Sequence, residues 1–203
     1  MLPNREKDRQ AILQTALDTV GQKPVYFDTE TTGTGPYDEV VEIGIVDYDG
    51  QVLLQALVKP RGSIPPDAAR IHGISNDMVR DALTWAELWP DVEKAFAGRL
   101  VAAYNTDFDV RLLRQSHARS QMQWRDPWKS TIDVMQVYAQ YHGEWNNRRG
   151  NYRWWKLEQA GRFCNIPLPN SHRAVDDALL TRALLEHIAA QAKPDEGEQL
   201  SMF

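Results

Sequence analysis

The sequence has very little cysteine and no long apolar run. Cys164 is the only cysteine among 203 residues, which excludes internal disulfides and cysteine-rich zinc sites. It lies in a segment with a helical pattern, so we expect a buried, unreactive thiol. No apolar run approaches the ~20 residues of a membrane span, and residues 1–8 are charged, unlike a secretory signal. We therefore expect a cytoplasmic protein with no membrane partner.

An excess of positive charge is also lacking. Lysine and arginine together number 23, against 28 aspartates and glutamates, which gives a net charge of −5. This balance argues against a protein that binds phosphate over a broad surface. It is compatible with a nuclease, because clustered carboxylates can hold cations that in turn bind phosphate. The hydrophobic content of 42% is sufficient for the core of one globular domain.

The periodicity of apolar residues predicts one α/β domain. Helices are predicted at residues 5–20, 86–96, 106–117, 154–164 and 173–190. Strands are predicted at residues 25–31, 39–47, 51–59, 100–104 and 131–135, with a hairpin turn at 48–50. Residues 60–81 have the composition of a loop with short helical pieces, and residues 143–153 that of an irregular loop. Hairpin-joined strands followed by alternating helices and strands imply a mixed sheet covered by helices. We expect a helical N-terminal extension over residues 1–23, the main domain over 24–192 and a solvated tail over 193–203.

Acidic residues recur at positions where the predicted elements would face one another. Asp28 and Glu30 are two apart in a strand, so both point to one face of the sheet. At helical spacing, Asp109 aligns with the apolar side of its helix, whereas Asp107 aligns with the solvent side. Phosphodiester cleavage can use two divalent ions held by such carboxylates, and Mg²⁺ prefers oxygen ligands.

The last predicted helix offers the same choice between neighbouring aspartates. Its apolar stripe places Asp177 on the inward side and Asp176 on the side that faces water. His172 lies on the approach to this helix, from which a loop could bring it over a metal site. An imidazole there is suited to take a proton from metal-bound water, and the alternative is an ordinary surface histidine.

The sequence resembles the DnaQ-like family of 3′→5′ exonucleases, in the subgroup named DEDDh for its four acids and histidine. The segments that carry the resemblance are residues 27–33, 71–74, 104–109 and 172–178, although a histidine is common in the family at the position of Tyr104. It implies an RNase H-like fold, with a mixed five-stranded sheet and helices on both faces. It also implies metal binding by Asp28, Glu30, Asp109 and Asp177, with His172 as the general base. The implied cofactors are two Mg²⁺ ions, for which Mn²⁺ would substitute, and the implied products are 5′ mononucleotides.

Several further residues are candidates for contacts with the nucleic acid. Under the resemblance, Thr31, Thr32, Asn105 and Phe108 would line the site. His72 would either contact the terminal nucleotide or order its loop through a hydrogen bond.

A polar, aromatic and basic stretch offers a second group of candidate contacts. Arg148 and Arg149 lie among aromatic residues that could form a platform for bases. Alternatively, Trp154 and Trp155 anchor the next helix in the core.

The C-terminal residues resemble the pentapeptide that binds the bacterial sliding clamp. In this motif glutamine forms hydrogen bonds, and the aliphatic and aromatic residues fill a pocket. The corresponding residues here are Gln199, Leu200, Met202 and Phe203, with Met202 where leucine is more usual.

The leading interpretation is an exonuclease that acts on single-stranded DNA 3′ ends in replication or repair. An exoribonuclease on the same scaffold and a non-catalytic nucleic-acid-binding adaptor are the alternatives.

Overall fold

A computed structural model describes residues 5–167 and 172–192 of the protein. Its centre is a mixed sheet of six strands in the order β4-β3-β2-β1-β5-β6. The strands are β1 (Val25–Thr31), β2 (Val40–Val46), β3 (Val52–Lys59), β4 (Leu83–Thr84), β5 (Leu100–Ala103) and β6 (Ser130–Asp133). β1 pairs antiparallel with β2 and parallel with β5, so it lies in the middle of the sheet.

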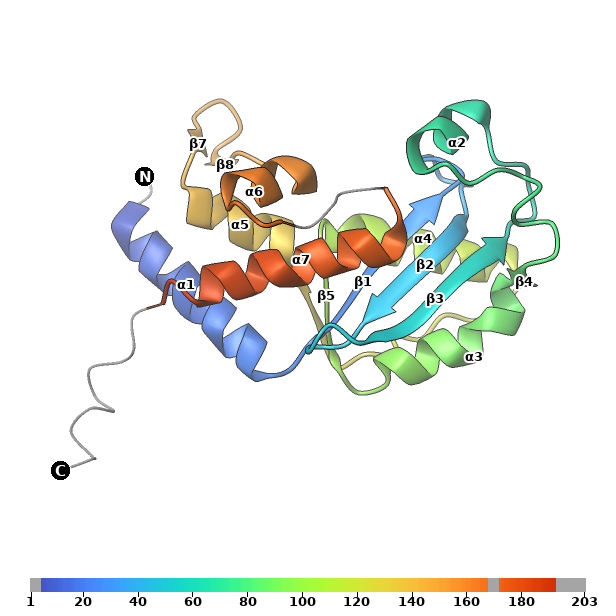
Figure 1. The fold of residues 1–203 in the computed structure, drawn as a ribbon, viewed down its shortest axis with the longest axis horizontal. Helices are drawn as coiled ribbons and strands as arrows, with labels where there is room; N and C mark the ends of the chain where they lie inside the picture. Colours follow the sequence, from blue (N-terminus) through green and yellow to red (C-terminus); the bar gives the residue numbers. More distant parts are fainter. Residues whose placement is uncertain (1–4, 168–171, 193–203) are drawn as a thin grey trace.

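Helices cover both faces of this sheet (Figure 1). They are α1 (Arg5–Gly21), α2 (Pro66–His72), α3 (Trp85–Phe96), α4 (Thr106–Arg119), α5 (Val134–His142), α6 (Leu157–Phe163) and α7 (Ala174–Ala189). Because successive side chains of a strand alternate between faces, Tyr26 packs with α1, α5, α6 and α7, whereas Phe27 packs with α3 and α4. The expected mixed sheet with helices on both faces is confirmed.

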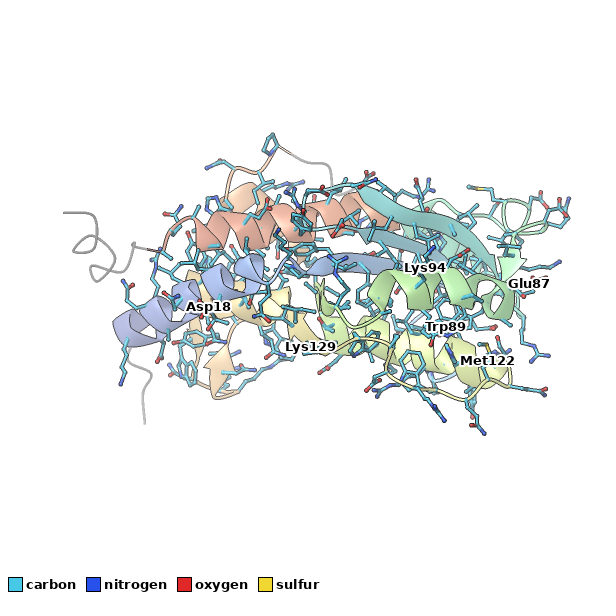
Figure 2. The ribbon with its side chains drawn as sticks, turned by 90° about the horizontal axis from the view of Figure 1, so that it is seen from below. Asp18, Glu87, Trp89, Lys94, Met122 and Lys129 are labelled. Carbon is cyan, nitrogen blue, oxygen red and sulfur yellow. The ribbon has the colours of Figure 1, made fainter. Side chains whose placement is uncertain are left out.

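Aromatic rings contribute to the core on the α3–α4 face of the sheet. Trp89 lies between α3 and α4, as Figure 2 shows, with its ring centroid 4.2 Å from that of His117. The His117 ring also accepts a hydrogen bond from the Trp85 indole at 2.8 Å. This packing fixes α4 against the sheet, and α4 carries one of the acidic residues discussed below.

The prediction of five strands was wrong, because β4 adds a sixth. It consists of Leu83 and Thr84, which pair parallel with Val58 and Lys59 at the edge of the sheet. Two residues are too few to produce a periodic sequence pattern.

Three other predictions of secondary structure differ from the structure. The strand predicted at 131–135 ends at Asp133, whose carboxylate accepts the Met135 N–H at 2.9 Å and caps the unpredicted helix α5. The loop predicted at 143–153 contains a hairpin of β7 (Trp145–Asn146) and β8 (Asn151–Tyr152). The helix predicted from residue 154 begins at Leu157.

α1 packs on the same core as α7. Ile12, Leu13 and Ala16 are buried in that cluster, so the helix does not project from the fold. The domain boundaries inferred from the sequence stay predictions, and residues 193–203 lie outside the described residues.

The environment of the single cysteine agrees with the expectation of a buried thiol. Cys164 is buried, and burial raises the pKa of its thiol to about 11. Within residues 5–167 and 172–192, no helix is both long enough and apolar enough to cross a bilayer. A cytoplasmic location stays a prediction.

Candidate active site

Three carboxylates converge beside the second half of the central strand. Asp28 and Glu30 come from β1, and Asp177 comes from the first turn of α7. One oxygen of each lies within 4.8 Å of an oxygen of the others. Asp177 is 6% exposed, and Asp28 and Glu30 are half-buried, so the group opens toward solvent on one side.

β2 determines how closely α7 approaches this group. Gly44 lies directly opposite Asp28 in the antiparallel pair. A Cβ at position 44 would lie 2.4 Å from the Val175 nitrogen and 2.5 Å from the Ala174 carbonyl carbon. Only glycine therefore lets the start of α7 rest on β2 at this distance, two residues before Asp177.

An ion pair between buried Glu42 and partly exposed Arg173 fixes the start of the same helix. Glu42, 1% exposed, accepts hydrogen bonds from the Arg173 guanidinium at 2.5 to 3.1 Å and from the Ala174 N–H at 3.1 Å. The second of these satisfies a backbone N–H that the first helical turn leaves without an intrahelical partner. Arg173 directly follows His172, so this pair anchors the segment that carries both His172 and Asp177.

Burial and mutual repulsion make the carboxylates costly to ionise. Burial, followed by the charges of Asp109 and Asp177, raises the pKa of Asp28 well above its usual range. Burial and the charge of Asp177 raise the pKa of Glu30 to about 8, against the opposing effect of Arg173. Acidic groups so arranged repel one another unless protons or cations neutralise them.

These donors suit hard divalent cations. All three are carboxylate oxygens, which Mg²⁺ and Mn²⁺ prefer, and they leave coordination positions for water or phosphate oxygens. A bound cation would also remove the repulsion among the three groups. The residues present therefore fit a divalent metal site.

Asp109 reaches the site from the other side of the sheet. It is buried, as its helical phase predicts, and it accepts the Thr29 hydroxyl at 2.7 Å. Burial raises its pKa to about 7, although that hydrogen bond opposes the shift. Asp109 lies near enough to Asp28 to raise the pKa of that residue, but it is not one of the three carboxylates within 4.8 Å. Its role as a metal ligand stays a prediction.

The two aspartates predicted to face solvent are more exposed than the two predicted to face inward. Asp107 is exposed on α4, and Asp176 on α7 is more exposed than the buried Asp177. The helical phase thus distinguished the inward aspartate on both helices.

His172 lies at the mouth of the site. It is exposed, with φ of 51°, and it lines one hollow of about 670 Å³ together with Asp28 and Asp177. We call this the carboxylate hollow; its other walls include Tyr104, Asn105 and Trp154. The imidazole therefore has access to the same space as the carboxylates.

Four other residues were predicted to line the site: Thr31, Thr32, Asn105 and Phe108. The Thr31 hydroxyl donates to the Gly33 carbonyl at 2.8 Å, and the Thr32 hydroxyl donates to Asp38 at 2.6 Å. Asn105 precedes α4 and lines the carboxylate hollow. Phe108 packs against the core of the α3–α4 face.

His72 has the hydrogen bond expected of a loop-ordering residue. It is 4% exposed, and its Nδ1 accepts the Ile74 N–H at 3.0 Å. Its Nε2 is buried, so a contact between His72 and the terminal nucleotide stays a prediction.

The basic stretch forms a second hollow. Arg148 and Arg149 line this space of about 650 Å³ at the β7–β8 hairpin, and we call it the hairpin hollow. The two tryptophans that follow have different environments: Trp155 packs against the core, and Trp154 is 55% exposed. The anchoring alternative therefore holds for Trp155 and not for Trp154, and the platform for bases stays a prediction.

Glu42 and Gly44 were not recognised in the sequence. Both interrupt the apolar run of β2, 40–46, which is otherwise a buried central strand. A charged residue and a glycine at such positions signal a buried partner and a close backbone approach, respectively.

An RNase H-like fold with carboxylates gathered beside the second half of its central strand defines a metal-dependent nuclease. Residues 25–185 match the exonuclease family named RNase_T, so the chain belongs to that family. It is a DnaQ-like exonuclease that acts on nucleic acids in the 3′→5′ direction.

Individual relatives agree with this assignment. The chain is 33% identical to exonuclease CP81 of Escherichia phage 186 over 184 residues. This match covers 88% of this chain and 94% of the relative. It is 28% identical to the DNA polymerase III subunit epsilon of Treponema pallidum, over 84% of this chain and 78% of the relative. Among solved structures, exonuclease X in complex with 5′ overhanging duplex DNA superposes with a TM-score of 0.61 at 25% identity, over 85% of this chain and 95% of the other.

Proposed function

We propose that the protein removes nucleotides from single-stranded DNA 3′ ends with two divalent metal ions and releases 5′ mononucleotides. The observation that carries this proposal is the group of Asp28, Glu30 and Asp177, whose oxygens lie within 4.8 Å of one another. Asp28 and Asp177 line a hollow that His172 also lines. Mg²⁺ is the proposed ion, and Mn²⁺ would substitute because it accepts the same oxygen ligands.

The ions would be held by Asp28, Glu30 and Asp177, with Asp109 as the fourth acid. Bound divalent ions supply a nucleophilic water and neutralise charge on the phosphate and the departing 3′ oxygen. His172 accepts the proton of the attacking water at an imidazole nitrogen, since it stands at the open side of the hollow. The Glu42–Arg173 pair holds the segment that carries His172 and Asp177 close to the sheet.

The other predicted contacts orient the terminal nucleotide. Asn105 lies on the wall of the carboxylate hollow, and the loop that Thr31 and Thr32 shape follows directly from β1. His72 would donate from Nε2, and Phe108 would stack from the start of α4.

DNA is the proposed substrate because two of the relatives are named for it. Subunit epsilon belongs to a DNA polymerase, and exonuclease X was captured on duplex DNA with a 5′ overhang. We also propose a role in DNA replication or repair, which the similarity to a DNA polymerase subunit supports. The four acids and the histidine do not select between deoxyribose and ribose, so RNA must be tested alongside.

The experiment uses 5′-end-labelled single-stranded DNA and RNA of one sequence, each with Mg²⁺ and with a chelator. We expect a ladder of shortened DNA only with Mg²⁺, and loss of that ladder in Asp28→Asn and Asp109→Asn. Asp107→Asn, a matched change on the exposed side of α4, should keep activity. Faster digestion of RNA would replace the substrate assignment, and digestion of neither would refute the proposal.

The C-terminal motif supports a second, separable proposal, namely binding to a sliding clamp. Its residues, Gln199, Leu200, Met202 and Phe203, lie outside the described residues, so the motif alone supports it. Deletion of residues 199–203 should abolish clamp binding in a pull-down and leave hydrolysis of short oligonucleotides unchanged. Undiminished binding of the truncated chain would contradict it.

Arg148 and Arg149 are proposed to contact the strand backbone. Replacing both with alanine should raise KM with little change in kcat. The salt dependence of binding should become shallower, by about 0.7 in log K against log salt for each lost phosphate contact. Replacement of Arg125 and Lys129 on the α4–β6 connection provides a charge-matched control.

A further inference from the structure

The hairpin hollow and the carboxylate hollow meet at one exposed ring. Trp154 lines both, and it is the only residue common to the two linings as the structure describes them. With 55% of its surface exposed, it is a large aromatic side chain that the core does not use. The space that begins at Asp28 and Asp177 therefore continues past Trp154 toward the tip of the hairpin.

The chemistry of the hairpin hollow suits a polyanion with aromatic bases. Arg148 and Arg149 are exposed, and within the described part of the chain neither forms an ion pair with a carboxylate. Asn147 adds an exposed amide to the same wall. Arg148 and Arg149 differ in this from Arg99, Arg119 and Arg173, each of which pairs with a carboxylate.

Contacts with α1 and within the hairpin hold the β7–β8 hairpin in a fixed position. The Tyr152 hydroxyl donates to Asp8 of α1 at 2.9 Å, and the Trp145 ring meets the Tyr152 ring edge-on at 5.1 Å. The adjoining backbone is also held, because the Tyr104 hydroxyl donates to the Trp155 carbonyl at 2.7 Å. A platform ordered before binding loses less conformational entropy when a strand docks.

We propose that this surface is a binding site for the strand on the 5′ side of the cleaved nucleotide. The proposal rests on the proposed function, since it requires the 3′ end to sit at the carboxylates. A strand with its terminal phosphodiester there must leave through the open side, and Trp154 stands at the continuation of that space. The Trp154 ring stacks on a base upstream of the cleaved bond, and Arg148 and Arg149 meet the phosphates beyond it.

The test compares a substrate with upstream bases and one without. The first is a single-stranded DNA octamer, and the second is the p-nitrophenyl ester of thymidine 5′-monophosphate, which can occupy only the carboxylate hollow. We expect Trp154→Ala to lower kcat/KM on the octamer about ten-fold, which corresponds to the loss of one stacked base. On the ester, which has no upstream base to stack, the loss of kcat/KM should be clearly smaller than on the octamer. Trp154→Phe should retain most activity on both, because a phenyl ring still stacks.

Control variants separate stacking from a structural role. Trp154→Leu keeps an apolar side chain without a ring, so it should resemble Trp154→Ala on the octamer. Tyr152→Phe removes the hydrogen bond to Asp8 and should cause a smaller loss, again only on the octamer.

Two outcomes would overturn the proposal, and a third would refute the proposed exonuclease function on which it rests. An equal loss on octamer and ester would make Trp154 a structural part of the carboxylate hollow. Full octamer activity in both Trp154→Ala and Trp154→Leu would remove it from the strand path. If the unaltered protein hydrolyses neither substrate with Mg²⁺, the proposed function itself fails.

Discussion

The replacement Gly44→Ala tests whether β2 sets the position of Asp177. The added Cβ would lie 2.4 Å from the Val175 nitrogen, 2.5 Å from the Ala174 carbonyl carbon and 2.8 Å from the Ala174 oxygen. Non-bonded heavy atoms rest at about 3.5 Å or more, so the first turn of α7 must retreat by about 1 Å. All three atoms belong to the backbone, so a change of side-chain rotamer cannot relieve the clash.

The retreat should affect activity more than stability. Overpacking of this kind costs about 1–3 kcal/mol, which for a chain of this size lowers Tm by about 2–4 °C per kcal/mol. A shift of about 1 Å in a group that holds reactants can cost about 10²-fold in rate. Because Asp28 is directly opposite Gly44, the shift separates Asp28 from Asp177. We therefore expect kcat to fall about 100-fold at a temperature where the variant is still folded.

The assay is hydrolysis of the p-nitrophenyl ester at a Mg²⁺ concentration that just saturates the unaltered protein, with Tm measured by circular dichroism. Gly62→Ala is the matched control, because a Cβ there meets nothing within 4 Å. A higher Mg²⁺ concentration should restore part of the activity of Gly44→Ala, since the cation draws the separated carboxylates together. Unchanged kcat in Gly44→Ala, with or without a lower Tm, would refute the reasoning.

Four further predictions concern single groups. His172→Gln should lower kcat by about 10²- to 10⁴-fold in steady-state assays and leave Tm unchanged, because the side chain is exposed. Glu42→Ala should destabilise the fold by about 1.5–3 kcal/mol in urea titration, since it removes hydrogen bonds to the charged Arg173. Mg²⁺ at about 100 times its Kd should stabilise the protein by about 2.7 kcal/mol in thermal denaturation, and Asp28→Asn should remove most of this effect. The Cys164 thiol should react with a disulfide reagent only on unfolding at neutral pH, because burial shields it and raises its pKa to about 11; rapid labelling of the native protein would contradict this.

Periodicity predicted the acidic residues well because each one lies on a regular element. A strand's period of two placed Asp28 and Glu30 on one face, and the structure brings their oxygens together. The helical repeat selected Asp177 over Asp176, and it is the buried member of the pair. Such inferences need only the direction of a side chain relative to its own element.

The features that the sequence did not predict depend on contacts between elements. β4 exists because two residues pair with the edge of β3, and the β7–β8 hairpin closes with two residues in each strand. Neither is long enough to show a period. The separate environments of Trp154 and Trp155 also arise from packing, since adjacent tryptophans have no local difference that would bury one and expose the other.

The position of Glu42 and Gly44 on one strand explains how the site can be assembled from distant segments. Both lie on β2 opposite the acidic residues of β1: Gly44 opposite Asp28 and Glu42 opposite Glu30. A second carboxylate beside Glu30 would by itself add repulsion, and Glu42 does raise the pKa of Glu30. Arg173 offsets that charge, and the same ion pair fastens the start of α7, while Gly44 makes the space that lets α7 approach. β2 contributes no proposed ligand, yet it holds the third acid of the group beside the other two. A substitution on this strand should therefore alter metal binding without touching a ligand.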